Sequence, residues 1–212
     1  IDADVRNNVF YNWRDWCGYG GAPNEGTINL NYVGNYLKAG PSTKKKTSRT
    51  AFLSGGNTTS IYGRGNKFHR HSDISDEDMI NVQRYGGRLL AKPITVAKVE
   101  TDTAKVAYQR VLTSAGAVLP VRDAVDTRIV KQVKNGRGKI INSQSEVGGW
   151  PKYKSATSDS DIDTDMDGMP RKWESKHGLN PERADHNEDP DKDGYTNIEE
   201  FLNGSDPRKA RI

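Results

Sequence analysis

Three short segments of the chain repeat one arrangement of polar and apolar positions. In each segment an asparagine stands two residues before a large apolar residue, and loops rich in glycine, serine and proline separate the segments. One short strand per repeat, at a period of about 20–50 residues, is typical of a solenoid in which each coil contacts only its neighbours. The asparagines that define the repeat are Asn8, Asn35 and Asn66, separated by 27 and 31 residues.

The repeated asparagines predict a ladder along the solenoid. Stacked asparagine side chains hydrogen-bond amide to amide, and asparagine also tolerates the left-handed backbone that a sharp corner between strands needs. The apolar residue two positions later is expected to point into the core. The alternative is three unrelated strands that share an asparagine by chance, because asparagine is common in turns.

The spacing of apolar residues changes along the chain. Apolar and polar residues alternate over 28–32, which predicts a half-buried strand. Over 103–116 the apolar residues recur every three or four positions, which predicts a helix with Thr103 as its N-cap and Gly116 as its stop. A second helix is predicted over about 123–134. We expect this helical pair to pack on the solenoid.

The C-terminal region contains two copies of the twelve-residue calcium loop of EF-hand proteins. Each copy has Asp at positions 1, 3 and 5, Gly at position 6 and Glu at position 12. Calcium takes six to eight oxygen ligands, and position 7 offers its backbone carbonyl. The alternative is an acidic solvated linker. The predicted calcium ligands are Asp163, Asp165, Asp167, Met169 and Glu174 in the first loop, and Asp189, Asp191, Asp193, Tyr195 and Glu200 in the second.

No helix is predicted before either loop, but a short helix is predicted after each, over 170–177 and 195–203. Thr196 and Glu199 form a capping box in the second of these helices. This pair of half-hands resembles the thrombospondin type 3 or dockerin-like repeats of secreted bacterial enzymes. The resemblance implies export and a tail that binds calcium, with docking on a scaffold protein as a further option.

Composition and charge narrow the class of protein. The chain has 212 residues, of which 33% are hydrophobic, and no apolar run approaches the ~20 residues of a membrane helix. Cys17 is the single cysteine, which excludes an internal disulfide. From Ala156 onward there are fifteen acidic and eight basic residues, so the remainder carries a net charge of +11. A basic body favours a polyanionic partner, either nucleic acid or acidic polysaccharide, although the charge also serves solubility.

Four segments then carry a resemblance to a known family. They are DVRNNVFYNW, YVGNYLKAGPST, AYQRVLTSAGAVLPVRDAVDTRIV and INSQSEVGGWP, within Ala3–Tyr153. This region resembles the C-terminal half of bacterial pectate lyases of polysaccharide lyase family 1. The resemblance implies a right-handed parallel β-helix and cleavage of polygalacturonate by β-elimination, with calcium acidifying the C5 proton and an arginine accepting it.

The resemblance also implies that the catalytic residues lie on earlier coils, before Ile1, so no catalytic residue is assigned here. A chain that starts in the middle of the repeat is expected to be part of a longer protein. The residues predicted to line the substrate groove are Arg6, Arg14, Tyr19 and Lys38. Their alternative role is that of ordinary loop residues, and for Arg6 that of a neighbour on the next coil.

Together these features predict a mainly β protein with three parts. Residues 1–100 form the C-terminal coils of a parallel β-helix, 101–153 a helical extension, and 154–212 the calcium loops. The predicted function is the C-terminal part of a secreted, periplasmic or surface pectate lyase, monomeric, with Ca²⁺ as cofactor and pectate as partner rather than nucleic acid or membrane. The alternative is a non-catalytic β-helix that binds acidic glycan and carries a dockerin-like tail. A pectin hydrolase would need paired aspartates on the coils, and none is found there.

Overall fold

The computed structural model describes residues 1–20, 26–53, 57–80, 86–118, 121–152 and 162–210. The chain divides into two compact units. The first comprises residues 1–118 and 122–149 and is called the solenoid unit; the second comprises 119–121 and 150–212 and is called the tail unit. Each is described by itself.

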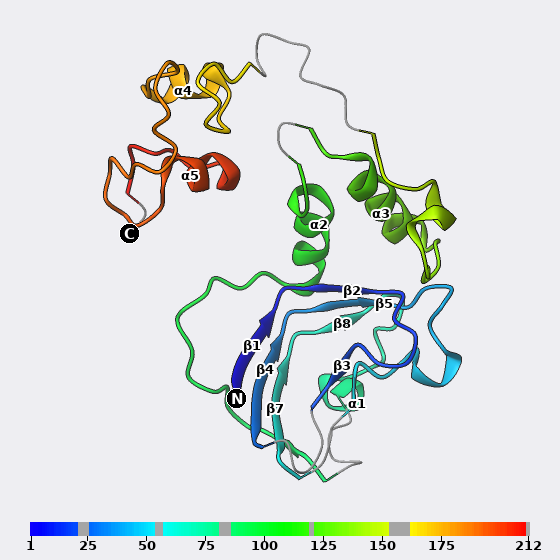
Figure 1. Cartoon of the computed structure of the whole chain (residues 1–212). Coiled ribbons are helices and arrows are strands. Elements are labelled where there is room, and N and C mark those ends of the chain that lie inside the picture. Colours follow the sequence, from blue (N-terminus) through cyan, green and yellow to red (C-terminus); the bar gives the residue numbers. More distant parts are fainter. Residues whose placement is uncertain (21–25, 54–56, 81–85, 119–120, 153–161, 211–212) are drawn as a thin grey trace. The chain divides into compact units, whose positions relative to one another are not determined.

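The solenoid unit is built from three parallel sheets that the chain visits in turn (Figure 1). The first sheet has the order β1-β4-β7-β9, the second β2-β5-β8 and the third β3-β6, and every strand pair is parallel. The strands are β1 (Asp2–Arg6), β2 (Val9–Tyr11), β3 (Gly18–Tyr19), β4 (Ile28–Val33), β5 (Tyr36–Lys38), β6 (Phe52–Leu53), β7 (Thr59–Arg64), β8 (Lys67–Phe68) and β9 (Arg88–Leu89).

The repeat predicted from the sequence sets the register of these strands. Phe10 pairs with Leu37 and Leu37 pairs with Phe68 along the second sheet. The three asparagines form the predicted ladder: Asn35 Oδ1 accepts hydrogen bonds from Asn8 N at 3.0 Å and Nδ2 at 3.2 Å. Asn66 Oδ1 accepts from Asn35 N and Nδ2, both at 2.9 Å. The ladder is therefore confirmed.

The corner beside the ladder differs from the expectation. The residues with left-handed backbone are those just before each ladder asparagine: Asn7 with φ 55°, Gly34 with φ 63° and Gly65 with φ 69°. The positive φ is needed where the chain turns from the first sheet to the second. The ladder asparagine follows the turn, and its side chain hydrogen-bonds to the ladder asparagine of the neighbouring coil.

One end of the ladder is closed by the short helix α1 (Asp76–Ile80). Asp76 Oδ1 accepts from Asn66 N at 2.9 Å and from Asn66 Nδ2 at 2.7 Å. A carboxylate only accepts hydrogen bonds, so the series of donors ends there. The same helix buries Met79 and Ile80, and a Cβ on Gly63 would clash with the Ile80 side chain.

The core fills the space between the sheets with large side chains from successive coils. Phe10 stacks on Tyr32 with ring centroids 5.8 Å apart, and Trp13 lies 6.0 Å from Phe68. Burial of this apolar area is the main stabilising contribution. The buried members of the cluster are Trp13, Leu30, Tyr32, Leu37, Ala51, Ile61, Phe68, Met79 and Ile80.

The segment between β9 and Asp102, most of which the sequence analysis included in the coils, meets the first sheet at Asn31. Asn31 on β4 is fully buried and exchanges hydrogen bonds of 3.1 and 3.0 Å with the backbone of Ile94. The chain then reaches the corner between the first and second sheets. There Asn7 Nδ2 donates to the Asp102 carbonyl, and Asp102 N donates to Asn7 Oδ1, both at 2.8 Å.

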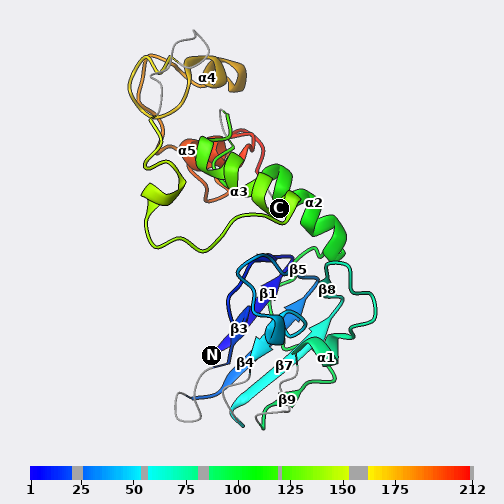
Figure 2. The same ribbon diagram turned by 90° about the vertical axis from the view of Figure 1, so that its right-hand side faces the viewer.

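The helical pair α2 (Ala104–Ser114) and α3 (Ala124–Asn135) follows as predicted. The Thr103 side chain accepts from Val106 N, and the Asp123 side chain accepts from Asp126 N. Both helices belong to the solenoid unit, and Figure 2 shows α2 beginning next to the second sheet. Short 3₁₀ turns lie at Lys45–Thr47 and Gln144–Val147.

The tail unit carries α4 (Arg171–His177) and α5 (Asn197–Asn203), each ended by a left-handed glycine. The predicted capping box is present at Thr196. Trp173 on α4 packs against Phe201 on α5, with ring centroids 5.2 Å apart. Among the described helices none combines the length and apolar character that crossing a membrane requires.

Candidate functional sites

The first candidate calcium loop gathers its carboxylates around two overlapping points. Oxygen atoms of Asp163, Asp165 and Asp167 lie within 4.8 Å of one another, and so do oxygen atoms of Asp167, Glu174 and Asp185. Glu174, on α4, is 0% exposed, and neither of its carboxylate oxygens has a hydrogen-bond partner among the described residues. Both carboxylate oxygens of Asp165 are also buried and have no hydrogen-bond partner among the described residues. Carboxylate oxygens without donors are what a hard divalent cation binds.

Local hydrogen bonds fold this loop. Asp163 Oδ1 accepts from Asp167 N at 3.1 Å, and Oδ2 accepts from Gly168 N at 2.8 Å. Met166 and Gly168 have φ of 60° and 94°, so the chain turns sharply at positions 4 and 6. Met169, at position 7, is fully buried.

The second loop repeats this geometry. Asp189 accepts from Lys192 N at 2.8 Å and from Gly194 N at 3.0 Å. Lys192 and Gly194 have φ of 61° and 96°, matching positions 4 and 6 of the first loop. Oxygen atoms of Asp189, Asp191 and Asp193 lie within 4.8 Å of one another, while Glu200 is buried on α5 and Tyr195 is half exposed.

The crowding of buried carboxylates in the first loop raises the pKa of some of them. Burial raises the pKa of Glu174 to about 7, and the neighbouring carboxylates Asp165, Asp167, Asp185 and Asp163 add to the rise. Burial also raises the pKa of Asp165 and of Asp191. Each carboxylate disfavours the charge of the next, and a bound cation would relieve this repulsion. The donor set therefore fits calcium.

Asp185 joins this site without having been predicted. It is 3% exposed, its carboxylate lies with those of Asp167 and Glu174, and its backbone N–H donates to Asp167 Oδ2 at 3.2 Å. It stands outside the twelve-residue spacing, so the loop pattern gives no signal for it. Its approach depends on how the chain returns after α4.

The four residues predicted to face substrate occupy different environments. Arg6 is held by Asp4, with bonds of 2.9 and 3.0 Å, and by Thr101 Oγ1 at 2.6 Å. Lys38 is buried, and its ammonium donates to the carbonyls of Val133 and Lys134 at the end of α3 at 2.6 and 3.0 Å. Burial lowers the pKa of Lys38. Both cations are thus engaged within the solenoid unit.

Arg14 and Tyr19 are open to solvent. The Arg14 side chain is 71% exposed beside Asp15, at 3.7 Å, and Tyr19 lies exposed on β3. Of the four predicted substrate contacts, Arg14 and Tyr19 are therefore the two whose side chains are exposed.

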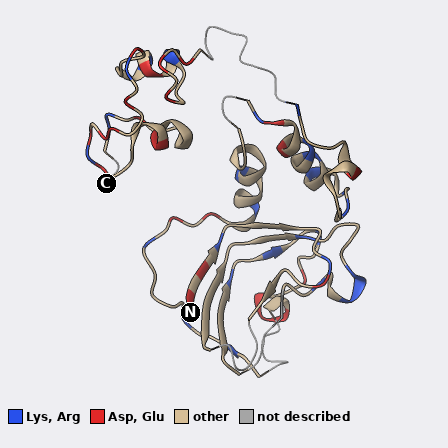
Figure 3. Ribbon diagram, in the orientation of Figure 1, with Lys and Arg blue, Asp and Glu red and all other residues tan. Residues whose placement is uncertain are grey.

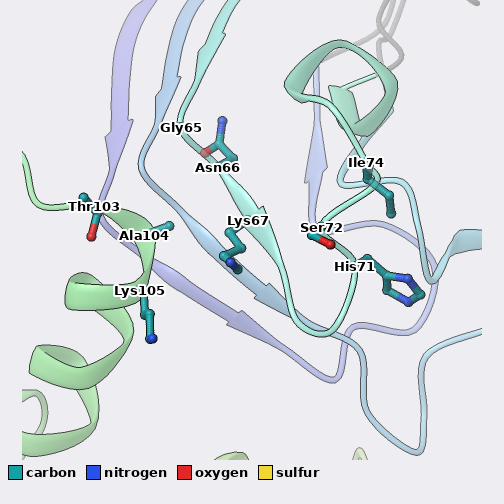
Figure 4. Close-up of a pocket in the computed structure, with 9 residues that line it drawn as sticks. All are labelled: Gly65, Asn66, Lys67, His71, Ser72, Ile74, Thr103, Ala104 and Lys105. Carbon is teal, nitrogen blue, oxygen red and sulfur yellow. The ribbon is translucent and has the colours of Figure 1, made fainter.

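A shallow basic pocket of about 320 Å³ lies beside the start of α2 (Figure 4). Lys67, His71 and Lys105 line it, and no carboxylate is among its lining residues. No sequence pattern indicates this pocket, because β8 and α2 are distant in the chain.

The tail unit, by contrast, is acidic. Figure 3 shows acidic positions recurring along it, and the sequence from Ala156 onward has fifteen acidic residues.

Comparison with known proteins adds one consistent finding. No family model matches the chain. It is similar to fungal proteins named "Probable pectate lyase C": those of Aspergillus flavus and Aspergillus oryzae are each 32% identical over 214 residues, covering 96% of this chain and 48% of the relative. That of Aspergillus terreus is 30% identical over 216 residues. These three relatives are fungal, whereas the resemblance of the sequence segments is to bacterial lyases.

The chain spans about half the length of the curated relatives it matches. A match over 96% of the chain cannot leave out the tail unit, which extends from Trp150 to Ile212. The similarity thus includes both units, and it supports a relationship to proteins named pectate lyase C.

Proposed function

We propose that this chain is the C-terminal part of a secreted, calcium-dependent pectate lyase that cleaves polygalacturonate by β-elimination. The observation that carries the proposal is the similarity, over 96% of the chain, to proteins named "Probable pectate lyase C". Because the chain spans 48% of such a relative, the proposal places the catalytic groups in coils that precede Ile1.

The solenoid unit supports this placement. Its in-register parallel strands suit a right-handed parallel β-helix. The ladder has a direction, since each asparagine oxygen accepts from the preceding coil. No described residue donates to Asn8 Oδ1, so a preceding coil with a donor at this position would continue the ladder.

The chemistry supports it as well. β-Elimination needs a base at C5 and a cation, held by protein ligands, to stabilise the developing negative charge. The groups of three metal-binding side chains found in the described residues all lie in the tail unit. Exposed Arg14 and Tyr19 of the solenoid unit are proposed as contacts to the carboxylated sugar.

The tail loops are proposed to bind one calcium ion each, in a structural role. Carboxylates surround each ion in this proposal, so little coordination is left for a sugar carboxylate. The resident ion neutralises a buried acidic cluster and orders the tail. Such loops suit an extracellular protein, where calcium is abundant.

Ultraviolet absorbance of the unsaturated product, from polygalacturonate with calcium, tests the lyase proposal. We expect activity from the complete gene product and none from residues 1–212 alone. Binding of polygalacturonate without product by the complete protein would favour the non-catalytic glycan-binding alternative. Activity in the 212-residue chain would overturn the proposed position of the catalytic groups.

A further inference from the structure

We propose that Asp185 is an additional ligand of the first calcium loop and that Asn197 connects it to the second loop, so that the two ions bind cooperatively. This inference rests on the proposed calcium loops and adds to them a ligand and a coupling that the twelve-residue motif does not contain. The observations that carry it lie within the tail unit.

Asp185 is placed as a ligand. Its carboxylate lies within 4.8 Å of those of Asp167 and Glu174, and all three residues are buried. Glu174 has both oxygens without a hydrogen-bond partner among the described residues, although it is 0% exposed. Three buried carboxylates at this separation repel one another. Asp185 has an ion pair with Arg183 at 3.3 Å and a hydrogen bond from Asn197 at 3.4 Å, both longer than the ~2.7–2.9 Å of a strong charged hydrogen bond. A divalent cation between them satisfies all three.

Asn197 connects this point to the second loop. It occupies position 9 of that loop, a ligand position in EF-hands, where it often acts through a water molecule. The residue is 1% exposed, and its Nδ2 donates to the Asp185 carbonyl at 2.8 Å. Its Oδ1 is buried and has no hydrogen-bond partner among the described residues. One amide thus binds the first site through its nitrogen and offers its oxygen to the second.

The backbone reinforces the connection. Asn197 N donates to the Glu188 carbonyl at 2.8 Å, and Ile198 N donates to the His186 carbonyl at 3.0 Å. These bonds join the start of α5 to the segment that follows Asp185. Since Glu200 lies on the same helix, an ion that fixes α5 also fixes Asp185. Coupling of this kind is reciprocal: each ion raises the affinity for the other by the same factor.

Calcium titration calorimetry on the full 212-residue chain tests the proposal. Glu200→Gln removes the second site and keeps the first, and Glu174→Gln removes the first site and keeps the second. The affinity of each site is therefore measured alone and compared with the wild-type isotherm. We expect both sites to weaken by the same factor, about tenfold. Asn197→Ala should reduce that factor to about one. Equal affinities with and without the other site would overturn the coupling.

Asp185→Asn tests the ligand separately, since it keeps the shape of the side chain and removes its charge. We expect the first site to weaken about tenfold or more. Glu182→Gln, the matched control, removes one charge from an exposed position three residues away and should leave both affinities unchanged. Equal behaviour of the two variants would overturn the ligand role. A wild-type chain that takes up no calcium would overturn the calcium-loop proposal itself, which is a different result from two independent sites.

Discussion

Glu174 combines complete burial, four acidic neighbours and a pKa of about 7. The carboxyl must lose its proton before it can bind a cation. We therefore expect the calcium affinity of the first loop to fall as the pH drops through about 7. Calcium titrations at pH about 8 and about 6 measure this fall. Glu200→Gln, which keeps the first loop, should keep the pH step, whereas an unchanged affinity of the wild type across that range would contradict the prediction.

In the metal-free protein, the same carboxyl makes the folded tail more stable at low pH, whereas calcium binding is favoured at high pH. Its folded pKa lies above the ordinary value of 4.5, so the folded tail binds the proton more tightly than the unfolded chain. Without calcium, the contribution of Glu174 to stability is therefore fully present below about 4.5 and is lost as the pH rises to about 7.

The carboxylates that each loop brings together could be predicted, because they follow one another within twelve positions. Asp185 could not, since it reaches the site only after α4 and the following turn have folded. Arg6 and Lys38 show the complementary difficulty. Their charge suggested a polyanion, but their partners Asp4 and the carbonyls of α3 depend on strand direction and tertiary packing.

Among the elements, the asparagine ladder is the clearest link from sequence to fold. Asn35 is fully buried; it donates to Asn66 Oδ1 and to the Val5 carbonyl and accepts from Asn8 N. Asn35→Ala leaves these groups without partners, at about 1–3 kcal/mol for each buried group. We expect the free energy of unfolding to fall by about 2–4 kcal/mol, as measured by urea denaturation.

Asn29→Ala is the matched control for this substitution, on the neighbouring strand β4. Its Nδ2 donates to Asp2 Oδ1 at 2.8 Å in an exposed position. Water can replace that bond, so the loss should be about 0.5 kcal/mol. Similar losses for the two variants would show that the ladder adds nothing beyond a surface hydrogen bond.

Lys38 connects a strand to a helix and provides the second test at this scale. Lys38→Met keeps the apolar stem but leaves the carbonyls of Val133 and Lys134 without their ammonium. Charged hydrogen bonds contribute about 1.5–3 kcal/mol, so we expect a destabilisation in this range and faster hydrogen exchange near the end of α3. Lys67→Met, at an exposed position on β8, should change neither quantity.

The start of α2 was predictable because a cap is a local interaction: Thr103 accepts a hydrogen bond from the backbone N–H three residues later. Asp123 caps α3 in the same way, although only the approximate start of that helix was predicted. The segment before Asp102 was not predictable, because it has no periodic pattern and its position depends on the Asn31 side chain that it meets. The pairing of distant strands was predictable only through the repeat. Without matching asparagines, nothing in β2, β5 or β8 would indicate their order.

For the whole molecule, the division into two units predicts that calcium acts on one of them. The groups of carboxylates suited to a cation, among the described residues, lie in the tail unit. Calcium at about 100 times its dissociation constant adds about 2.7 kcal/mol per site. For a unit of this size that corresponds to a rise in melting temperature of about 10 °C or more.

Calorimetric unfolding of the 212-residue chain, with calcium and with a chelator, measures this effect. Trp173, packed between His177 and Phe201 in the tail unit, gives an independent fluorescence signal for the same transition. We expect calcium to raise the tail transition and to leave the solenoid transition, whose core contains Trp13, in place. The variant that combines Glu174→Gln with Glu200→Gln should lose the calcium-dependent rise while keeping the solenoid transition. If calcium raised both transitions equally in the wild type and in this variant, the ions would act outside the two loops, and the structural role proposed for them would be wrong.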